Sequence, residues 1–275
     1  MPFINSSQNN NEPVKIYYED LGKGKPVVFI HGWPLSGSMW EYQLTQLPQQ
    51  GFRCIVYDRR GFGKSDRPFT GYDYDTLAGD LKSLLDELDL NDVTLVGFSM
   101  GGGEIAKYFG LYNGARVSKA VLVSAVVPYM LQTDSNPDGV PQEVFNDMAQ
   151  AMQDDRPSFL EGFNKDFYGA GLLNHPVSEA YLNSALNKAM DASPIATIEC
   201  AKSFSSTDFR QDVLKINVPT LIIHGDEDKT VPIKATGEQS AKLISGAVFK
   251  VYEGAPHGLW FTEKEKLNQD LIDFI

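Results

Sequence analysis

The sequence is poor in the residues that build disulfide frameworks. Its 275 residues include only two cysteines, Cys54 and Cys200, and no C-x-x-C pair. Two cysteines are too few for such a framework, and no neighbouring pattern marks either one as a nucleophile. We therefore expect two reduced thiols that are mostly buried.

Clustered positive charge and long apolar runs are also missing. Lys and Arg total 24 against 36 Asp and Glu, a formal net charge of −12, and the basic residues are scattered singly. Phosphate binding needs clustered cations, so we expect no nucleic-acid partner. No stretch approaches the roughly 18 uninterrupted apolar residues of a membrane span, and residues 1–13 lack the basic and apolar segments of a signal peptide. We predict a soluble, cytoplasmic protein without a membrane partner.

What the sequence does contain is a series of short β-branched runs separated by helical patterns, which are clearest at residues 75–89, 104–112 and 263–274. Continuous apolar runs alternating with helices are typical of a parallel sheet covered on both faces. Residues 3–6 and 14–20, on either side of the polar SSQNNN, are expected to form a hairpin at the sheet edge. The other predicted strands are 27–30, 54–58, 93–98, 119–125, 220–225 and 248–253. We predict an α/β fold with an open, doubly wound, eight-stranded, mostly parallel sheet.

One long stretch, residues 127–218, lacks strong strand signals and contains helix-like pieces such as residues 141–152. A structureless connection of this length is uncommon in a compact domain. We expect a helical cap insertion over the carboxyl edge of the sheet. Residues 1–126 and 219–275 would then form the core domain.

A serine between glycines stands where a predicted strand meets a predicted helix. Residues 97–101 read G-F-S-M-G, and this G-x-S-x-G pattern between strand and helix is the context of a nucleophile elbow. Side chains at Gly97 or Gly101 would clash with the adjoining backbone of so sharp a turn. Ser99 is therefore a candidate nucleophile, although a glycine-rich connecting turn would have the same letters.

A serine nucleophile needs a histidine base and a carboxylate that orients it. In enzymes built this way the chain order is Ser, Asp or Glu, then His, and only His257, directly after the last strand, satisfies that order. The stretch HGDEDK supplies the acid, for which Asp228 is the first candidate and Asp226 the second. An exposed turn or a divalent-ion site including His224 is the alternative for this acidic cluster.

The remaining histidines have simpler interpretations. His31 and His224 each precede a glycine at a strand end, where an imidazole usually bonds to loop backbone. His175, in the cap, is expected to be a surface loop residue. The segment DRRGFGKS (58–65) combines glycines with paired charges and is expected to be a rigid structural loop.

Acyl transfer also requires donors for the developing oxyanion. These are expected to be the backbone N–H groups of Met100, directly after the nucleophile, and of Trp33 in HGWP, since Pro34 has no N–H. The indole of Trp33 either lines the pocket or packs in the core. The other candidate pocket residues are Phe163, Phe167 and Val231, and ordinary packing of cap on sheet is the alternative for the two phenylalanines.

With these residues placed, the chain resembles α/β-hydrolases from end to end, and more narrowly the bacterial aryl esterases and cofactor-free haloperoxidases, with γ-lactamases close behind. The stretches that carry the resemblance are HGWPLSGSMWE (31–41), YDRRGFGKSDRP (57–68), TGYDYDTLAGDL (70–81), VTLVGFSMGGGE (93–104), GVPQEVF (139–145), VPTLIIHGDEDKTVP (218–232) and EGAPHG (253–258). Carried over, it implies Ser99 as nucleophile, His257 as base, Asp228 as acid, and an oxyanion hole formed by the Trp33 and Met100 amides.

The resemblance implies a serine hydrolase acting on aryl or short-chain carboxylic esters through an acyl-enzyme, without metal or cofactor. If hydrogen peroxide replaces water as the acyl acceptor, the product is a peracid that oxidises halide, as expected for a secondary activity. Hydrolysis of a lactam is the alternative within enzymes, and a non-catalytic small-molecule receptor is the alternative outside them. Relatives of this kind often form homo-oligomers, which is a further expectation.

Overall fold

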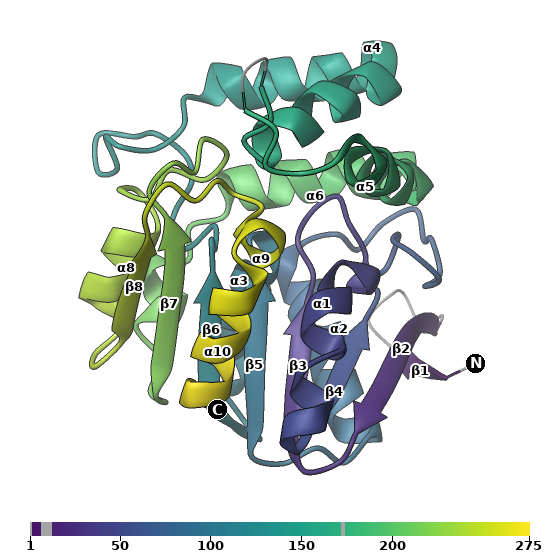
Figure 1. Cartoon of the computed structure of the whole chain (residues 1–275), viewed down its shortest axis with the longest axis vertical. Coiled ribbons are helices and arrows are strands. Elements are labelled where there is room, and N and C mark those ends of the chain that lie inside the picture. The colour runs from purple at the N-terminus through teal and green to yellow at the C-terminus, as the bar shows by residue number, and fades with distance from the viewer. Residues whose placement is uncertain (1, 7–12, 172–173) are drawn as a thin grey trace.

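The computed structural model describes residues 2–6, 13–171 and 174–275. Within these ranges the strands form one eight-stranded sheet in the order β1-β2-β4-β3-β5-β6-β7-β8 (Figure 1). The strands are β1 (Phe3–Ser6), β2 (Val14–Gly22), β3 (Lys25–Ile30), β4 (Phe52–Tyr57), β5 (Val93–Phe98), β6 (Val117–Val123), β7 (Thr220–Gly225) and β8 (Val248–Tyr252). β2 pairs antiparallel with β1 and β4, and every other neighbouring pair is parallel. The predicted mostly parallel α/β sheet is confirmed, and the predicted turn at its edge hairpin lies mainly at residues 7–12, outside the described residues.

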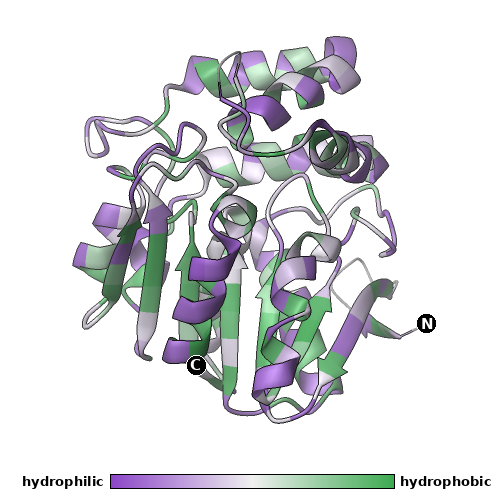
Figure 2. Cartoon of the chain, viewed as in Figure 1, coloured by the Kyte–Doolittle hydropathy of each residue, from purple (hydrophilic) through white to green (hydrophobic). Residues whose placement is uncertain are grey.

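The central strands are buried on both faces. Along β3, Val28 and Ile30 belong to one hydrophobic core, and Val27 and Phe29 belong to the other, because successive side chains of a strand point to opposite faces. Figure 2 shows the central strands mostly green, whereas the helices carry purple, white and green segments. A sheet of this kind leaves only its ends and edges for function.

Two groups of helices cover the two faces, as predicted. One core contains side chains of α2 (Tyr74–Glu87), α3 (Met100–Tyr112) and α7 (Arg210–Val213), with α8 (Gly237–Leu243) packed against it. The other contains side chains of the short helices η1 (Gly37–Trp40) and η2 (Leu47–Gln50), together with α9 (Leu259–Thr262) and α10 (Lys264–Phe274), and α1 (Glu41–Leu44) joins η1 to η2. None of the helices in the described ranges combines the length and the apolar character needed to cross a membrane.

Three longer helices follow β6 and lie together beyond the carboxyl ends of the parallel strands (Figure 1). They are α4 (Gln142–Phe167), α5 (Glu179–Asp191) and α6 (Pro194–Ser206). The helix predicted at residues 141–152 is thus the first part of α4, which continues past a non-helical residue at Asp155, two residues before Pro157. Serine side chains cap α5 and α6: Ser178 accepts from the Tyr181 amide, and Ser193 accepts from the Ala196 amide.

Two predicted boundaries differ from the structure near the end of β5 and β6. The helix expected at residues 104–112 begins at Met100, because Gly101, Gly102 and Gly103 are helical residues that let α3 lie against its neighbours. A Cβ at Gly101 would come 2.6 Å from the Ile30 carbonyl oxygen. Strand β6 ends at Val123 rather than at residue 125, since Ser124 has a positive φ of 44°.

Candidate active site

Ser99 occupies the sharp turn between β5 and α3. Its backbone has φ 52° and ψ −117°, a conformation that a non-glycine residue rarely adopts. The turn is tight enough that a Cβ at Gly97 would come 2.6 Å from the Gly101 carbonyl oxygen, and one at Gly101 would meet Ile30. The flanking glycines are therefore required by the close approach of backbone to backbone, and the serine side chain is held at the carboxyl end of β5.

Three predicted residues from distant parts of the chain meet at this turn. His257 Nε2 lies 3.0 Å from Ser99 Oγ, and His257 Nδ1 lies 2.6 Å from Asp228 Oδ2. Asp228 lies after β7 and His257 after β8, so parallel strands bring both to the same edge as Ser99. All three side chains are buried, and the imidazole packs against the rings of Phe98 and Phe167, with centroids 4.8 Å and 4.6 Å away.

The surroundings of Asp228 favour its ionised form. Its Oδ1 accepts hydrogen bonds from the Thr230 and Val231 amides at 2.9 and 2.8 Å, and its Oδ2 faces both His257 and His224. Burial by itself raises the pKa of the carboxyl, but attraction to His257 and hydrogen bonds from His224 and His257 outweigh it, so the pKa lies well below its usual value. This anion is suited to fix the hydrogen of His257 on Nδ1, which leaves the Nε2 lone pair facing the Ser99 hydroxyl.

The second acidic candidate points elsewhere. Asp226 is exposed, and its Oδ1 accepts a hydrogen bond from the Gly254 amide at 2.6 Å. It therefore ties the loop after β7 to the loop after β8, whereas the His257 imidazole bonds to Asp228 and Ser99. Across the described residues no cluster of three or more His, Cys, Asp or Glu side chains has the arrangement of a metal site.

The other histidines behave as expected from their positions. His31 Nδ1 lies 2.9 Å from the Gly32 carbonyl oxygen, and the Arg59 amide donates to His31 Nε2 at 2.9 Å. Because an amide can only donate, Nε2 carries no hydrogen, and burial and the Arg59 charge together hold the pKa of His31 well below its usual value. His224 Nε2 lies 3.0 Å from the Val231 carbonyl oxygen, and His175 is exposed.

One candidate oxyanion donor directly follows Ser99 in the chain, and the other lies in a loop that packs close to Ser99. Met100 is the first residue of α3, where a backbone N–H has no intrahelical acceptor. Trp33 lies in the loop after β3, and the preceding Gly32 is so close that a Cβ there would come 3.3 Å from Ser99 Cβ. In the described part of the chain, neither the Trp33 amide nor the Met100 amide donates to a protein acceptor.

A mainly apolar cavity of about 530 Å³ opens onto Ser99 and His257. The predicted pocket residues Trp33, Phe163, Phe167 and Val231 all line it. Trp33 lines the cavity and is also a member of the buried core, and its Nε1 donates to the Thr197 carbonyl oxygen in α6 at 2.9 Å. Several other lining residues have no signal in the sequence that marks them for the site, and they are Val126, Met130, Phe145, Met148, Phe159 and Phe204.

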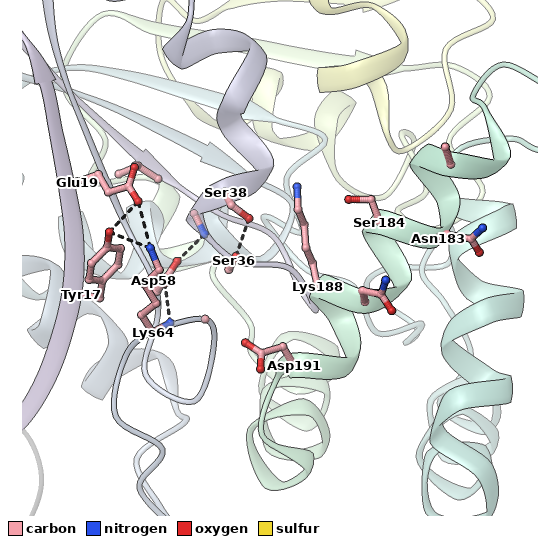
Figure 3. A pocket seen from close by; sticks show the side chains of 15 residues that line it. Tyr17, Glu19, Ser36, Ser38, Asp58, Lys64, Asn183, Ser184, Lys188 and Asp191 are labelled. Atoms are coloured by element: carbon pink, nitrogen blue, oxygen red, sulfur yellow. Dashed lines mark hydrogen bonds and ion pairs between the residues drawn. The ribbon is translucent and has the colours of Figure 1, made fainter. Parts of the chain in front are cut away.

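A second hollow, of about 570 Å³, lies between α5 and the core and is shown in Figure 3. Its charged groups are largely engaged with each other or with backbone. Lys64 Nζ contacts Tyr17 Oη at 3.0 Å and Glu19 at 3.6 Å, and Asp58 accepts from the amides of Gly37 and Lys64. It contains none of the candidate catalytic side chains.

The segment DRRGFGKS has the structural role expected of it. Arg59 pairs with Glu104 and Arg60 pairs with Asp80, and all four side chains are buried.

Both cysteines are free and buried as predicted, and burial raises the pKa of each thiol to about 12. Neither thiol is poised for nucleophilic chemistry.

Comparisons with known proteins agree over most of the chain. The family described as alpha/beta hydrolase fold matches residues 25–264. A non-heme chloroperoxidase of Kitasatospora aureofaciens is 45% identical over 95% of this chain and 96% of that protein. A bifunctional esterase/perhydrolase of Acinetobacter calcoaceticus is 40% identical over 95% of this chain and 96% of that protein. The solved structure of a bromoperoxidase from Bacillus anthracis has a TM-score of 0.95 and 45% identity, covering 99% of this chain and 98% of that one.

Proposed function

Because the chain belongs to the α/β-hydrolase fold family and is similar to its non-heme haloperoxidases and esterase/perhydrolases, we propose that it is a serine hydrolase that cleaves carboxylic esters. The observation that carries the proposal is the continuous chain of hydrogen bonds from Ser99 Oγ through both nitrogens of His257 to Asp228. A hydroxyl is a weak nucleophile near neutral pH, and this arrangement supplies the base that it requires.

In the proposed acylation, His257 Nε2 accepts the Ser99 proton as Oγ bonds to the ester carbonyl carbon. The carbonyl π pair moves onto oxygen, where the Trp33 and Met100 amides stabilise the negative charge. Collapse of this intermediate breaks the bond to the leaving alkoxide, which takes the proton from His257. Water then attacks the acyl-enzyme by the same route and releases the acid.

Hydrogen peroxide is the proposed second acceptor. It gives up a proton to His257, its oxygen bonds to the acyl carbon, and Ser99 leaves with that proton, so the product is a peracid. The peracid then oxidises halide in solution. The names of the chloroperoxidase and esterase/perhydrolase relatives favour this second activity. Both acceptors would use the same Ser99, His257 and Asp228 side chains. We propose that ester hydrolysis is the primary activity and perhydrolysis the secondary one.

We further propose that residues 127–218 act as a cap on the core formed by residues 1–126 and 219–275. Support comes from the cavity, whose walls combine α4 and α6 residues such as Phe163 and Phe204 with core residues such as Val231. The cap would then select among acyl and alcohol groups. A strained lactam remains the alternative substrate, and a homo-oligomer in the cytoplasm stays a prediction from the sequence.

The test compares wild-type protein with Ser99→Ala, using Ser184→Ala on exposed α5 as the matched control. Wild type and the control are expected to hydrolyse p-nitrophenyl acetate and to be labelled by a fluorophosphonate, whereas Ser99→Ala loses about 10⁴-fold or more of kcat and is not labelled. Equal turnover by wild type and Ser99→Ala would refute the proposal. A folded wild type that neither reacts with esters or lactams nor labels would favour the receptor alternative.

Two further measurements test whether hydrogen peroxide serves as an acyl acceptor and whether ester hydrolysis needs a metal ion. With hydrogen peroxide and acetate, wild type is expected to form peracetic acid and Ser99→Ala is not. A chelator such as EDTA is expected to leave ester hydrolysis unchanged. Activity lost to EDTA and restored by a divalent ion would contradict a mechanism that uses only protein groups.

A further inference from the structure

We propose that Arg59, through its buried pair with Glu104, is a positioning residue that sets the spacing between the two oxyanion donors, the amides of Trp33 and Met100. The proposal rests on the proposed function, because it concerns how that site holds its oxyanion. Arg59 touches neither Ser99 nor His257, but its side chain is bonded to both elements that carry the donors.

The first of these elements is the loop after β3. The Arg59 guanidinium donates through Nη2 to the His31 carbonyl oxygen at 2.6 Å, and the Arg59 amide donates to His31 Nε2 at 2.9 Å. The amide bond fixes the imidazole hydrogen on Nδ1, which faces the Gly32 carbonyl oxygen at 2.9 Å, and the guanidinium bond holds the His31 backbone. Arg59 therefore orients His31, and His31 in turn bonds to the peptide group between Gly32 and Trp33.

That peptide group contains one of the donors. The Gly32 carbonyl oxygen accepts from His31 Nδ1 and from the Leu35 amide at 3.1 Å. In a planar trans peptide the carbonyl and the following N–H point in opposite directions, so the Trp33 N–H is turned away from His31. The placement of the Trp33 donor thus depends on His31, and through it on Arg59.

The second element is α3. Arg59 Nε donates to Glu104 Oε1 at 2.6 Å, Nη2 forms an ion pair with the same oxygen, and Tyr57 Oη donates to Glu104 Oε2 at 2.6 Å. Glu104 lies four residues after Met100, on the same face of the helix. Its anchoring by Arg59 and Tyr57 fixes the first turn of α3, where the Met100 amide lies.

Oxyanion stabilisation depends on where the donors lie relative to the developing charge, so a small displacement is costly. A guanidinium can bond to the His31 carbonyl and to Glu104 at once, because its donors form a rigid planar fork. A lysine ammonium is a single point charge on a flexible stem and does not reproduce both bonds together. Replacement of Arg59 by Lys should therefore loosen the relation between the two donors while keeping the buried positive charge.

The neighbouring Arg60 offers a matched control. It forms an equally buried pair with Asp80 on α2, with Nε and Nη2 each 2.6 Å from a carboxylate oxygen. Within the described residues, Arg60 and Asp80 form no hydrogen bond or ion pair with the loop after β3 or with α3, and the charge of Asp80 acts on Glu104 only through space. Arg60→Lys and Asp80→Asn should thus lower stability without moving the donors.

The experiment measures kcat and KM for p-nitrophenyl acetate, together with Ki for an aliphatic trifluoromethyl ketone and for the corresponding alcohol. The ketone forms a hemiketal on Ser99 whose oxygen bears the charge of the intermediate, whereas the alcohol tests binding to the cavity alone. We expect Arg59→Lys to lower kcat about 100-fold with little change in KM, and to raise the ketone Ki by a similar factor, with the alcohol Ki unchanged. Arg60→Lys should keep kcat and both Ki values close to wild type.

If Arg59→Lys does not fold, as judged by circular dichroism, the same kinetic and inhibition constants are measured for Glu104→Gln, with Asp80→Asn as its control. The proposal is overturned if the Arg59 and Arg60 variants lose equal fractions of kcat, or if the ketone Ki is unchanged in the Arg59 or Glu104 variant. These outcomes differ from failure of the proposed function, in which wild type itself is neither labelled by the fluorophosphonate nor more active than Ser99→Ala.

Discussion

His224 and Asp228 lie four residues apart, and His224 Nε2 lies 3.2 Å from Asp228 Oδ2, the same oxygen that faces His257. The same Nε2 lies 3.0 Å from the Val231 carbonyl oxygen. Both neighbours are acceptors, so Nε2 carries a hydrogen shared between them. Two imidazoles therefore contact one carboxylate oxygen in the proposed site, one along the proton path and one beside it.

Replacement of His224 by Leu removes a hydrogen bond to the ionised Asp228 and should lower kcat for p-nitrophenyl acetate about 10-fold, with KM little changed. Among the described residues, the bond to His257 is then the only side-chain restraint left on this oxygen. His224→Gln retains an N–H donor and is expected to recover most of the loss. Equal losses in the Leu and Gln variants would show that the contact with Asp228 does not matter. Steady-state kinetics of both variants decide the question.

The stability of the fold should decrease as the pH falls below about 6.5, because His31 is buried without its second proton. Its pKa in the folded state is well below the usual value, so the unfolded chain binds a proton that the folded chain does not. His31 therefore contributes stability above the unfolded pKa, and this contribution is lost as the pH falls towards the folded pKa. The expected slope from this group is about 1.4 kcal/mol of unfolding free energy per pH unit.

Urea denaturation at pH 7, 6 and 5 measures this slope. His31→Gln, which has no group that titrates in this range, should show a smaller decrease than wild type. His175→Gln, at an exposed histidine, is the matched control. Depression of the Asp228 pKa adds its own loss only at pH values below about 3.9, outside this window. Parallel curves for wild type and His31→Gln would contradict the prediction.

The size of the cavity should set the acyl preference. Phe163 lines it, with its ring 5.3 Å from the rings of both Trp33 and Phe167. Truncation to Ala opens space next to the site, so kcat/KM for p-nitrophenyl octanoate relative to the acetate should rise about 10-fold, a factor that corresponds to one or two further buried methylene groups. Phe69→Ala, at a site 77% exposed and away from the cavity, should leave the ratio unchanged. If this ratio of kcat/KM values is unchanged in Phe163→Ala, Phe163 does not limit the size of the acyl group.

The parts of the site that sequence reasoning could predict are those set by local backbone geometry and by chain order. The glycines around Ser99 are needed by the turn itself, and the position of His257 after the last strand follows from the parallel sheet. The choice of Asp228 over Asp226 came from this order and the family resemblance. Only the coordinates show that Asp226 bonds to the Gly254 amide instead.

The parts that the sequence did not predict depend on packing between distant segments. The sequence around Glu104 predicts a helix but does not show whether Glu104 faces solvent or the core. Nothing nearby in the chain indicates that it is buried against Arg59 and Tyr57. Met130 and Phe204 come from a loop and from α6, and their place in the cavity depends on how α6 lies over the sheet. Three-dimensional contacts of this kind have no periodic signal in one sequence.

The two thiols should be inert in the folded protein. Cys54 lies within β4 and Cys200 within α6, both fully buried, and burial raises the pKa of each to about 12, so almost no thiolate is present at pH 8. A chromogenic disulfide reagent should label neither residue in native protein and both in guanidinium, while ester hydrolysis remains intact after native treatment. Since labelling then requires opening of the fold, its rate should follow unfolding across a urea series. Rapid labelling of one thiol in water would show that its strand or helix is less tightly packed than the contacts indicate, and Cys54→Ala and Cys200→Ala would identify which.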